Sequence, residues 1–89
     1  MTANRLPKLA AKARLTWDRV GSRYLLLYPE RGLVLNDSAA GILKLCDGVR
    51  PLDEIVDSLA RDRPGADRER VRQDVDAFLA EMRKRGLVV

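Results

Sequence analysis

The sequence contains no histidine and a single cysteine, Cys46. A chain without histidine cannot build the Ser-His-Asp or Cys-His systems of many hydrolases, and it lacks the usual Cys/His ligand sets for zinc. One cysteine also excludes an intramolecular disulfide. Carboxylates are plentiful, but they alternate with arginines along helix-like segments, where ion pairs in solvent are the ordinary interpretation. We therefore expect a protein that is not an enzyme and that holds no metal and no cofactor.

The chain also lacks a signal peptide and any apolar run that approaches a membrane span, so we expect a cytoplasmic protein without membrane contact. Its 89 residues suffice for one small domain of modest stability. The net charge of +4 comes from residues 1–14, and the other 13 bases are balanced by the 13 acids. We predict a basic flexible arm over residues 1–14, followed by a domain over residues 15–89. The bases of the arm are Arg5, Lys8, Lys12 and Arg14.

Three short apolar segments, 15–18, 24–28 and 33–35, predict an antiparallel sheet. The second and third segments are joined by Pro29-Glu30-Arg31-Gly32, in which proline and glycine both favour a turn. Because side chains alternate across a strand, neither face of this sheet is polar. One face must be covered by the chain's own helices, and the other by the N-terminal segment, a second copy or a ligand.

Apolar residues at helical spacing predict three helices after the sheet. The first begins at Asn36-Asp37-Ser38 and ends at Asp47-Gly48; the second begins with Pro51 and ends by Arg63-Pro64-Gly65; the third runs from Asp67 to Arg85, where Gly86 ends it. The predicted fold class is α+β: a three-stranded antiparallel β-sheet followed by a three-helix bundle, resembling a winged helix.

In such an arrangement the third strand can leave its outer edge open beside the third helix. An extended peptide in that groove would add a strand along the segment Gly32, Leu33, Val34 and Leu35. Its side chains would meet a wall formed by Val71, Val75 and Phe78. The alternative interpretation of this wall is that its residues are core, because an apolar helical stripe is buried in any fold.

One set of motifs resembles the PqqD family of pyrroloquinoline quinone biosynthesis, and the resemblance covers about residues 14–89. It lies in Tyr28-Pro29-Glu30-Arg31-Gly32-Leu33-Val34-Leu35-Asn36, then Ala39, Ile42-Leu43, Leu45-Cys46-Asp47-Gly48 and Glu54-Ile55-Val56. The resemblance implies a peptide-recognition domain that acts as a non-catalytic chaperone. It would bind the precursor peptide PqqA and present it to the radical SAM enzyme PqqE, which would carry the iron–sulfur chemistry. It also implies that residues 32–35 form the peptide-binding strand.

Three further interpretations depend on exposure. Arg31, Asp47, Gly48 and Arg50 are candidates for contact with the partner enzyme, whereas Trp17 and Cys46 are expected in the core. The exposed strand edge could also pair two copies into a homodimer. The alternative function is a winged-helix DNA-binding protein, since the chain is basic. We expect no nucleic-acid partner, because the arginines of the third predicted helix alternate with acids instead of clustering.

Overall fold

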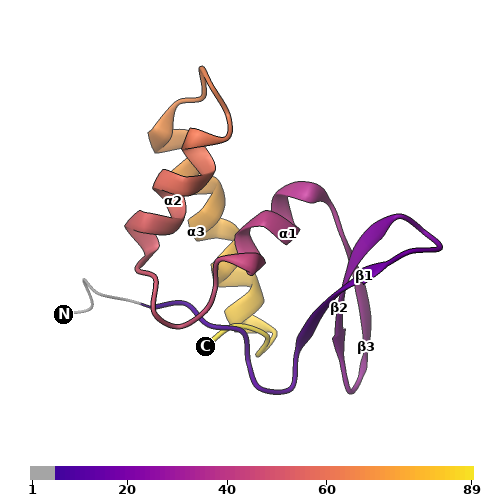
Figure 1. Cartoon of the computed structure of the whole chain (residues 1–89). Helices are drawn as coiled ribbons and strands as arrows, with labels where there is room; N and C mark the ends of the chain where they lie inside the picture. Colours follow the sequence, from indigo (N-terminus) through magenta and orange to yellow (C-terminus); the bar gives the residue numbers. More distant parts are fainter. Residues whose placement is uncertain (1–5) are drawn as a thin grey trace.

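The computed structural model describes residues 6–89 and has three strands followed by three helices (Figure 1). The strands form an antiparallel sheet in the order β1-β2-β3. The predicted fold class is therefore confirmed. The elements are β1 Arg14–Asp18, β2 Arg23–Tyr28, β3 Arg31–Leu35, α1 Asp37–Lys44, α2 Leu52–Arg61 and α3 Arg68–Lys84.

α1 lies between the sheet and the pair formed by α2 and α3, so the sheet projects from one end of the helical part (Figure 1). The inner face of the sheet, which packs on α1, contributes Leu26 and Leu35 to the core, and both are buried. A single continuous core extends from these residues through the three helices to Leu87 and Val88 near the C-terminus. Burial of this apolar surface is the main stabilising contribution to so small a domain.

The helix ends follow the capping residues of the sequence, with two exceptions. The Asn36 side chain accepts a hydrogen bond from the Ala39 amide at 2.8 Å and starts α1. Gly86, at φ +74°, follows the end of α3, as predicted. Pro51, however, precedes α2 as its N-cap instead of occupying the first helical position, and α1 ends at Lys44, before the predicted Asp47-Gly48 stop.

The N-terminal segment differs most from the prediction, because residues 7–10 are bound to the end of the chain. Lys8 and Val89 exchange both main-chain hydrogen bonds, at 3.2 and 2.7 Å, and the Ala10 amide donates to the Leu87 carbonyl at 2.9 Å. Pro7 is fully buried. The prediction of a flexible arm is thus wrong for this segment, which we call the terminal clasp together with residues 47–48 and 87–89. Residues 1–5, including Arg5, lie outside the described residues.

Trp17 is not the core residue that we expected. It lies on the inner face of the sheet, but its side chain is 48% exposed. Its ring packs edge-on against Tyr24, with 4.8 Å between ring centroids, and the Lys44 ammonium lies 4.3 Å from the Tyr24 ring. Trp17 therefore lies at the surface, whereas Tyr24 is partly buried against the core.

Candidate functional site

The outer edge of β3 is unpaired within residues 6–89, because β3 is the last strand of the sheet. The register of the β2–β3 hairpin decides which main-chain groups of β3 face outward. Tyr28 and Arg31 flank the two-residue turn and must therefore exchange both hydrogen bonds. The bonded pairs then recur at every second residue, so Leu33 and Leu35 pair with β2. The N–H and C=O groups of Gly32 and Val34 consequently point to the free edge.

An apolar cavity of about 260 Å³ opens where β3 passes into α1. It lies between α1, the end of α2 and the first half of α3. The apolar residues that line it are Ala39, Ile42, Leu59, Val71, Val75 and Phe78, and the polar ones are Asn36, Ser38, Arg63 and Asp74. Asn36 directly follows the free edge, so a strand added to β3 would end beside this cavity.

The structure brings the three predicted wall residues of α3 together in this cavity, but they differ in how far they are exposed. Val71 and Val75 are only 4% and 1% exposed and belong mainly to the core, whereas Phe78 is partly buried. Residues 32–35 are not among the lining residues. The cavity therefore adjoins the end of the free edge, and α1 supplies the wall nearest to it.

Sequence reasoning missed the polar rim of the cavity. Arg63 donates to the Ser38 hydroxyl at 2.7 Å, which ties the loop after α2 to the first turn of α1. These residues are 25 positions apart, and no spacing pattern relates them. Asn36 and Ser38 were noticed only as capping residues, because a helix N-terminus by itself does not indicate a ligand.

Three arginines in the first half of α3, Arg68, Arg70 and Arg72, are engaged in ion pairs. Arg68 contacts Asp57 at 2.7 Å and Arg72 contacts Asp53 at 2.5 Å, both on α2, while Arg70 lies 3.7 Å from Asp74. The hydrogen bond that Arg72 donates to the Asp53 carboxylate raises the pKa of Arg72 above its usual value. A helix that reads DNA keeps its bases free for phosphates and base edges. This arrangement therefore argues against the DNA-binding alternative.

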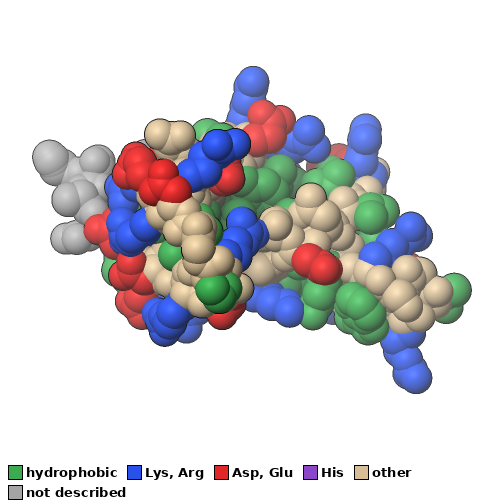
Figure 2. All heavy atoms as spheres, turned by 90° about the horizontal axis from the view of Figure 1, so that it is seen from above, with side chains coloured by type: hydrophobic (Ala, Val, Ile, Leu, Met, Phe, Trp, Pro, Cys, Tyr) green, Lys and Arg blue, Asp and Glu red, His purple; other side chains and the backbone are tan. Residues whose placement is uncertain are grey.

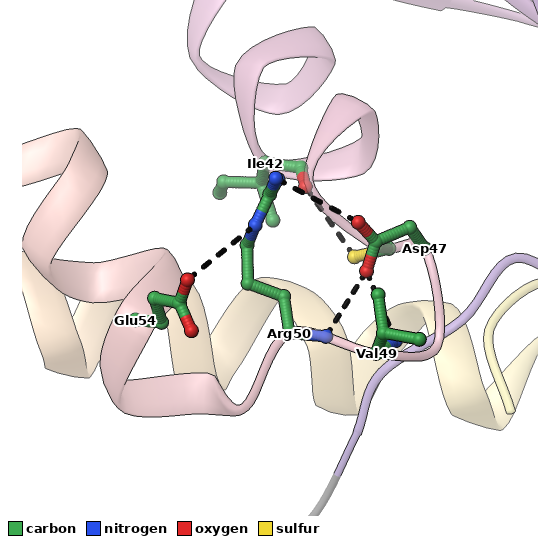
Figure 3. Close-up of polar contacts among 6 residues, drawn as sticks. Ile42, Asp47, Val49, Arg50 and Glu54 are labelled. Carbon is green, nitrogen blue, oxygen red and sulfur yellow. Dashed lines mark hydrogen bonds and ion pairs between the residues drawn. The ribbon is translucent and has the colours of Figure 1, made fainter.

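The Asp47-Gly48 turn, predicted as an exposed contact, has a structural role (Figure 3). The Asp47 carboxylate accepts hydrogen bonds from the amides of Val49 and Arg50, both at 3.0 Å. These bonds and the Arg50 guanidinium lower the pKa of Asp47. Gly48, at φ +83°, donates its amide to the Pro7 carbonyl at 3.0 Å. The turn thus orients the loop before α2 and holds the terminal clasp.

Arg50 and Arg31 differ in their surroundings. The Arg50 guanidinium lies 3.7 Å from Asp47 and 3.9 Å from Glu54, so it bridges the turn to α2. Arg31 is exposed beside the β2–β3 turn. Of the four predicted enzyme contacts, Arg31 is the one whose side chain is exposed and has no hydrogen bond or ion pair within the described residues.

Cys46 is buried, as the sequence predicts, and its thiol donates a hydrogen bond to the Ile42 carbonyl at 3.3 Å. Burial raises the pKa of this thiol to about 11. The neutral thiol therefore predominates at pH 7, and it is a poor nucleophile. Within residues 6–89, no cluster of acidic and sulfur ligands could hold a metal ion, and no helix has the length and apolarity needed to cross a bilayer.

Comparisons with known proteins point to one family. A family model described as "Coenzyme PQQ synthesis protein D (PqqD)" matches residues 23–88, which include β2, β3 and all three helices. Two relatives are named "PqqA binding protein". The one from Rhodopseudomonas palustris strain TIE-1 is 40% identical over 82 residues, covering 92% of this chain and 79% of that protein. The one from Azotobacter vinelandii is 38% identical over 87 residues, covering 98% and 92%.

A solved structure supports the same assignment. The chain resembles the solution NMR structure of the PqqD truncation of Methylobacterium extorquens PqqCD, with a TM-score of 0.78 and 29% identity. The similarity covers 100% of this chain and 99% of that one. That protein is described as a functional, stand-alone recognition element for ribosomally synthesised and post-translationally modified peptides.

Proposed function

The chain belongs to the PqqD family, and from this premise we propose that it is a non-catalytic chaperone that binds the precursor peptide PqqA. The peptide adds as a fourth strand to the free edge of β3 and is presented to the radical SAM enzyme PqqE. The observation that carries this proposal is the outer edge of β3, which no strand of residues 6–89 pairs with and which ends beside an apolar cavity.

The edge supplies affinity through main-chain groups. Gly32 and Val34 each offer one donor and one acceptor to an incoming strand, so up to four ladder bonds can form. Each bond contributes about 1 kcal/mol net. Four bonds thus contribute about 4 kcal/mol, which corresponds to a Kd of only about 1 mM. They also say nothing about sequence, because every peptide has the same backbone.

The cavity supplies selectivity for the peptide sequence. A bound strand that extends past Leu35 reaches the cavity rim at Asn36, where one apolar side chain of the peptide can enter between Ile42 and Phe78. Burial of such a side chain contributes about 1.5–3 kcal/mol. The backbone edge and the cavity together therefore favour an extended peptide with an apolar residue at a fixed distance from the paired segment.

Presentation to the enzyme leaves the chemistry to the partner. The same edge could pair two copies of the chain, and this dimer would compete with the peptide because both occupy the main-chain groups of β3. Arg31 lies at the turn beside this edge and remains our candidate for contact with the enzyme.

An NMR titration of ¹⁵N-labelled protein with synthetic PqqA tests the proposal. We expect the amide resonances of Gly32 and Val34 to move most within β3, because their N–H groups face the peptide. Resonances of Ala39 and Phe78 should follow if the cavity is filled. A saturated complex in which the β3 amides stay unchanged, or one that maps to the solvent side of α2 and α3, would overturn it.

A further inference from the structure

The sheet has an outer face that no element of the described chain covers. Pairing places Thr16, Leu25 and Val34 in one row of this face and Arg14, Leu27 and Gly32 in the next. The side chains of Leu27 and Val34 are 39% and 57% exposed. α1 covers the opposite face, so these aliphatic side chains form a surface outside the core.

Cations border this surface. Lys12 and Arg14 line a hollow of about 240 Å³ together with Leu27, Tyr28 and Pro29. Neither base has an ion-pair partner among the described residues, and residues 1–5 contain no acid that could supply one. Arg23, in contrast, is neutralised by Asp18 at 3.2 Å.

The charge of the molecule is divided between its two ends. The sheet end, residues 12–35, carries five bases and two acids, whereas residues 36–89 together with Lys8 of the terminal clasp carry eleven bases and eleven acids. In Figure 2, red side chains gather mainly over the helical part, while green and blue side chains dominate at the sheet end. The outer face is therefore an apolar surface in a positive environment.

We propose that this outer face, defined by Lys12, Arg14, Leu25, Leu27 and Val34, docks a partner protein that presents apolar side chains bordered by carboxylates. The aliphatic residues of the sheet bury the apolar part, and Lys12 and Arg14 pair with the carboxylates at the hollow. Such an arrangement has the apolar centre and charged rim of a transient protein interface.

The positive charge of the outer face favours an acidic partner protein over a second copy of the chain or nucleic acid. A second copy would bring two positive faces together, and residues 1–5 add Arg5 and no acid. Nucleic acid would have to cover three aliphatic side chains, which is unfavourable in free energy. The aromatic residues that could stack with bases, Trp17 and Tyr24, lie on the inner face. An acidic protein surface satisfies both the cations and the apolar side chains.

The candidate for this partner is the modifying enzyme PqqE, which the proposed function names. The inference rests on the proposed function only in this choice of partner. The face and the peptide-binding edge belong to the same strand but point in perpendicular directions, since side chains stand out of the sheet and main-chain groups lie in its plane. One strand could thus hold the peptide by its edge while the enzyme rests on its face.

The test measures enzyme binding and peptide binding separately in the full chain. Leu27→Glu and Arg14→Glu alter the face without touching the outward amides of Gly32 and Val34. We expect each to weaken the affinity for purified PqqE at least tenfold while the affinity for synthetic PqqA stays within twofold. Ala77→Glu, at an exposed position of α3, is the matched control for Leu27→Glu, because it adds the same single negative charge elsewhere, and it should leave both affinities unchanged.

The remaining measurements decide whether PqqE or another partner occupies the outer face. In the unaltered chain, the methyl resonances of Leu25 and Leu27 should broaden on addition of PqqE, whatever the variants do. Unchanged enzyme affinity in both variants, or no enzyme binding at all, overturns the inference while peptide binding stands. Loss of peptide affinity with enzyme affinity intact contradicts the proposed separation of the two surfaces. A dimer abolished by Leu27→Glu, or DNA binding abolished by Arg14→Glu, would assign the face to those occupants instead.

If synthetic PqqA fails to bind the unaltered chain, the proposed function is wrong, yet the methyl resonances still report whether the enzyme docks on this face. The two failures are therefore distinguishable.

Discussion

Replacement of Val34 by proline tests the peptide-binding edge directly, because it removes one outward N–H group. Proline is tolerated on the free side of an edge strand, so the variant should fold. Loss of one ladder bond costs about 1 kcal/mol, and a peptide carbonyl left without a partner raises this toward 3 kcal/mol. Since each 1.4 kcal/mol is tenfold, the affinity for synthetic PqqA should fall by about 5- to 100-fold. Isothermal titration calorimetry on the variant measures this change.

Two controls separate the amide from other effects. Val34→Ala keeps the N–H and shortens an exposed side chain, so its peptide affinity should change little. Leu33→Pro removes an amide that pairs with Leu26 inside the sheet, so the lost bond and the carbonyl left without a partner should destabilise the fold by about 1–3 kcal/mol. Unaltered peptide affinity in a folded Val34→Pro protein would refute the proposed edge. A stable Leu33→Pro protein beside an unfolded Val34→Pro protein would show that the outward residues have been assigned in the wrong register.

Four further predictions follow from the site and the core. Phe78→Asp should reduce PqqA affinity at least tenfold without loss of the fold, measured by calorimetry and circular dichroism, and an unchanged affinity would remove the cavity from the site. Addition of PqqA should convert any edge-paired dimer to monomer in sedimentation, and a persistent dimer with bound peptide would place the dimer contact elsewhere. Gly48→Ala should lower the Tm by several degrees more than Gly65→Ala, since both have positive φ but a Cβ on Gly48 would lie 2.9 Å from the Lys8 side chain; equal losses would show that the Lys8 side chain moves aside without disturbing the clasp. The free energy of unfolding should fall as pH rises from about 9 to about 11, because an unfolded Cys46 thiol releases its proton at 9.0 and the buried one at about 11; the Cys46→Ala variant should lose this part of the slope, and an identical slope in both proteins would contradict it.

The fold could be predicted because its determinants are local. Alternating apolar strands, the Pro29–Gly32 turn and the capping residue Asn36 each act over a few positions, and the structure places every strand and helix in the predicted order. The predicted end of α1 was wrong because Gly48, whose positive φ is typical of a helix stop, belongs instead to the loop that the Asp47 carboxylate organises.

The parts that sequence could not reveal depend on the backbone or on distant contacts. The clasp is built from main-chain hydrogen bonds around Lys8 and Val89, which leave no side-chain pattern, so the segment looked like a solvated arm. The outward orientation of the Val34 amide depends on the register of the hairpin. The cavity is assembled from three helices, and the Arg63–Ser38 bond joins two of them across a separation that no local pattern reports.

The terminal clasp brings Lys8, near the start of the described residues, side by side with Val89, and Figure 1 places the C-terminus beneath the helical part, away from the projecting sheet. A second protein fused through a linker to either end would thus be tethered to this side of the molecule. The fused protein would start far from the hairpin and leave the sheet margin accessible. The fold is consequently suited to genetic fusion with a larger protein at either end, because the fusion partner does not obstruct the peptide-binding strand.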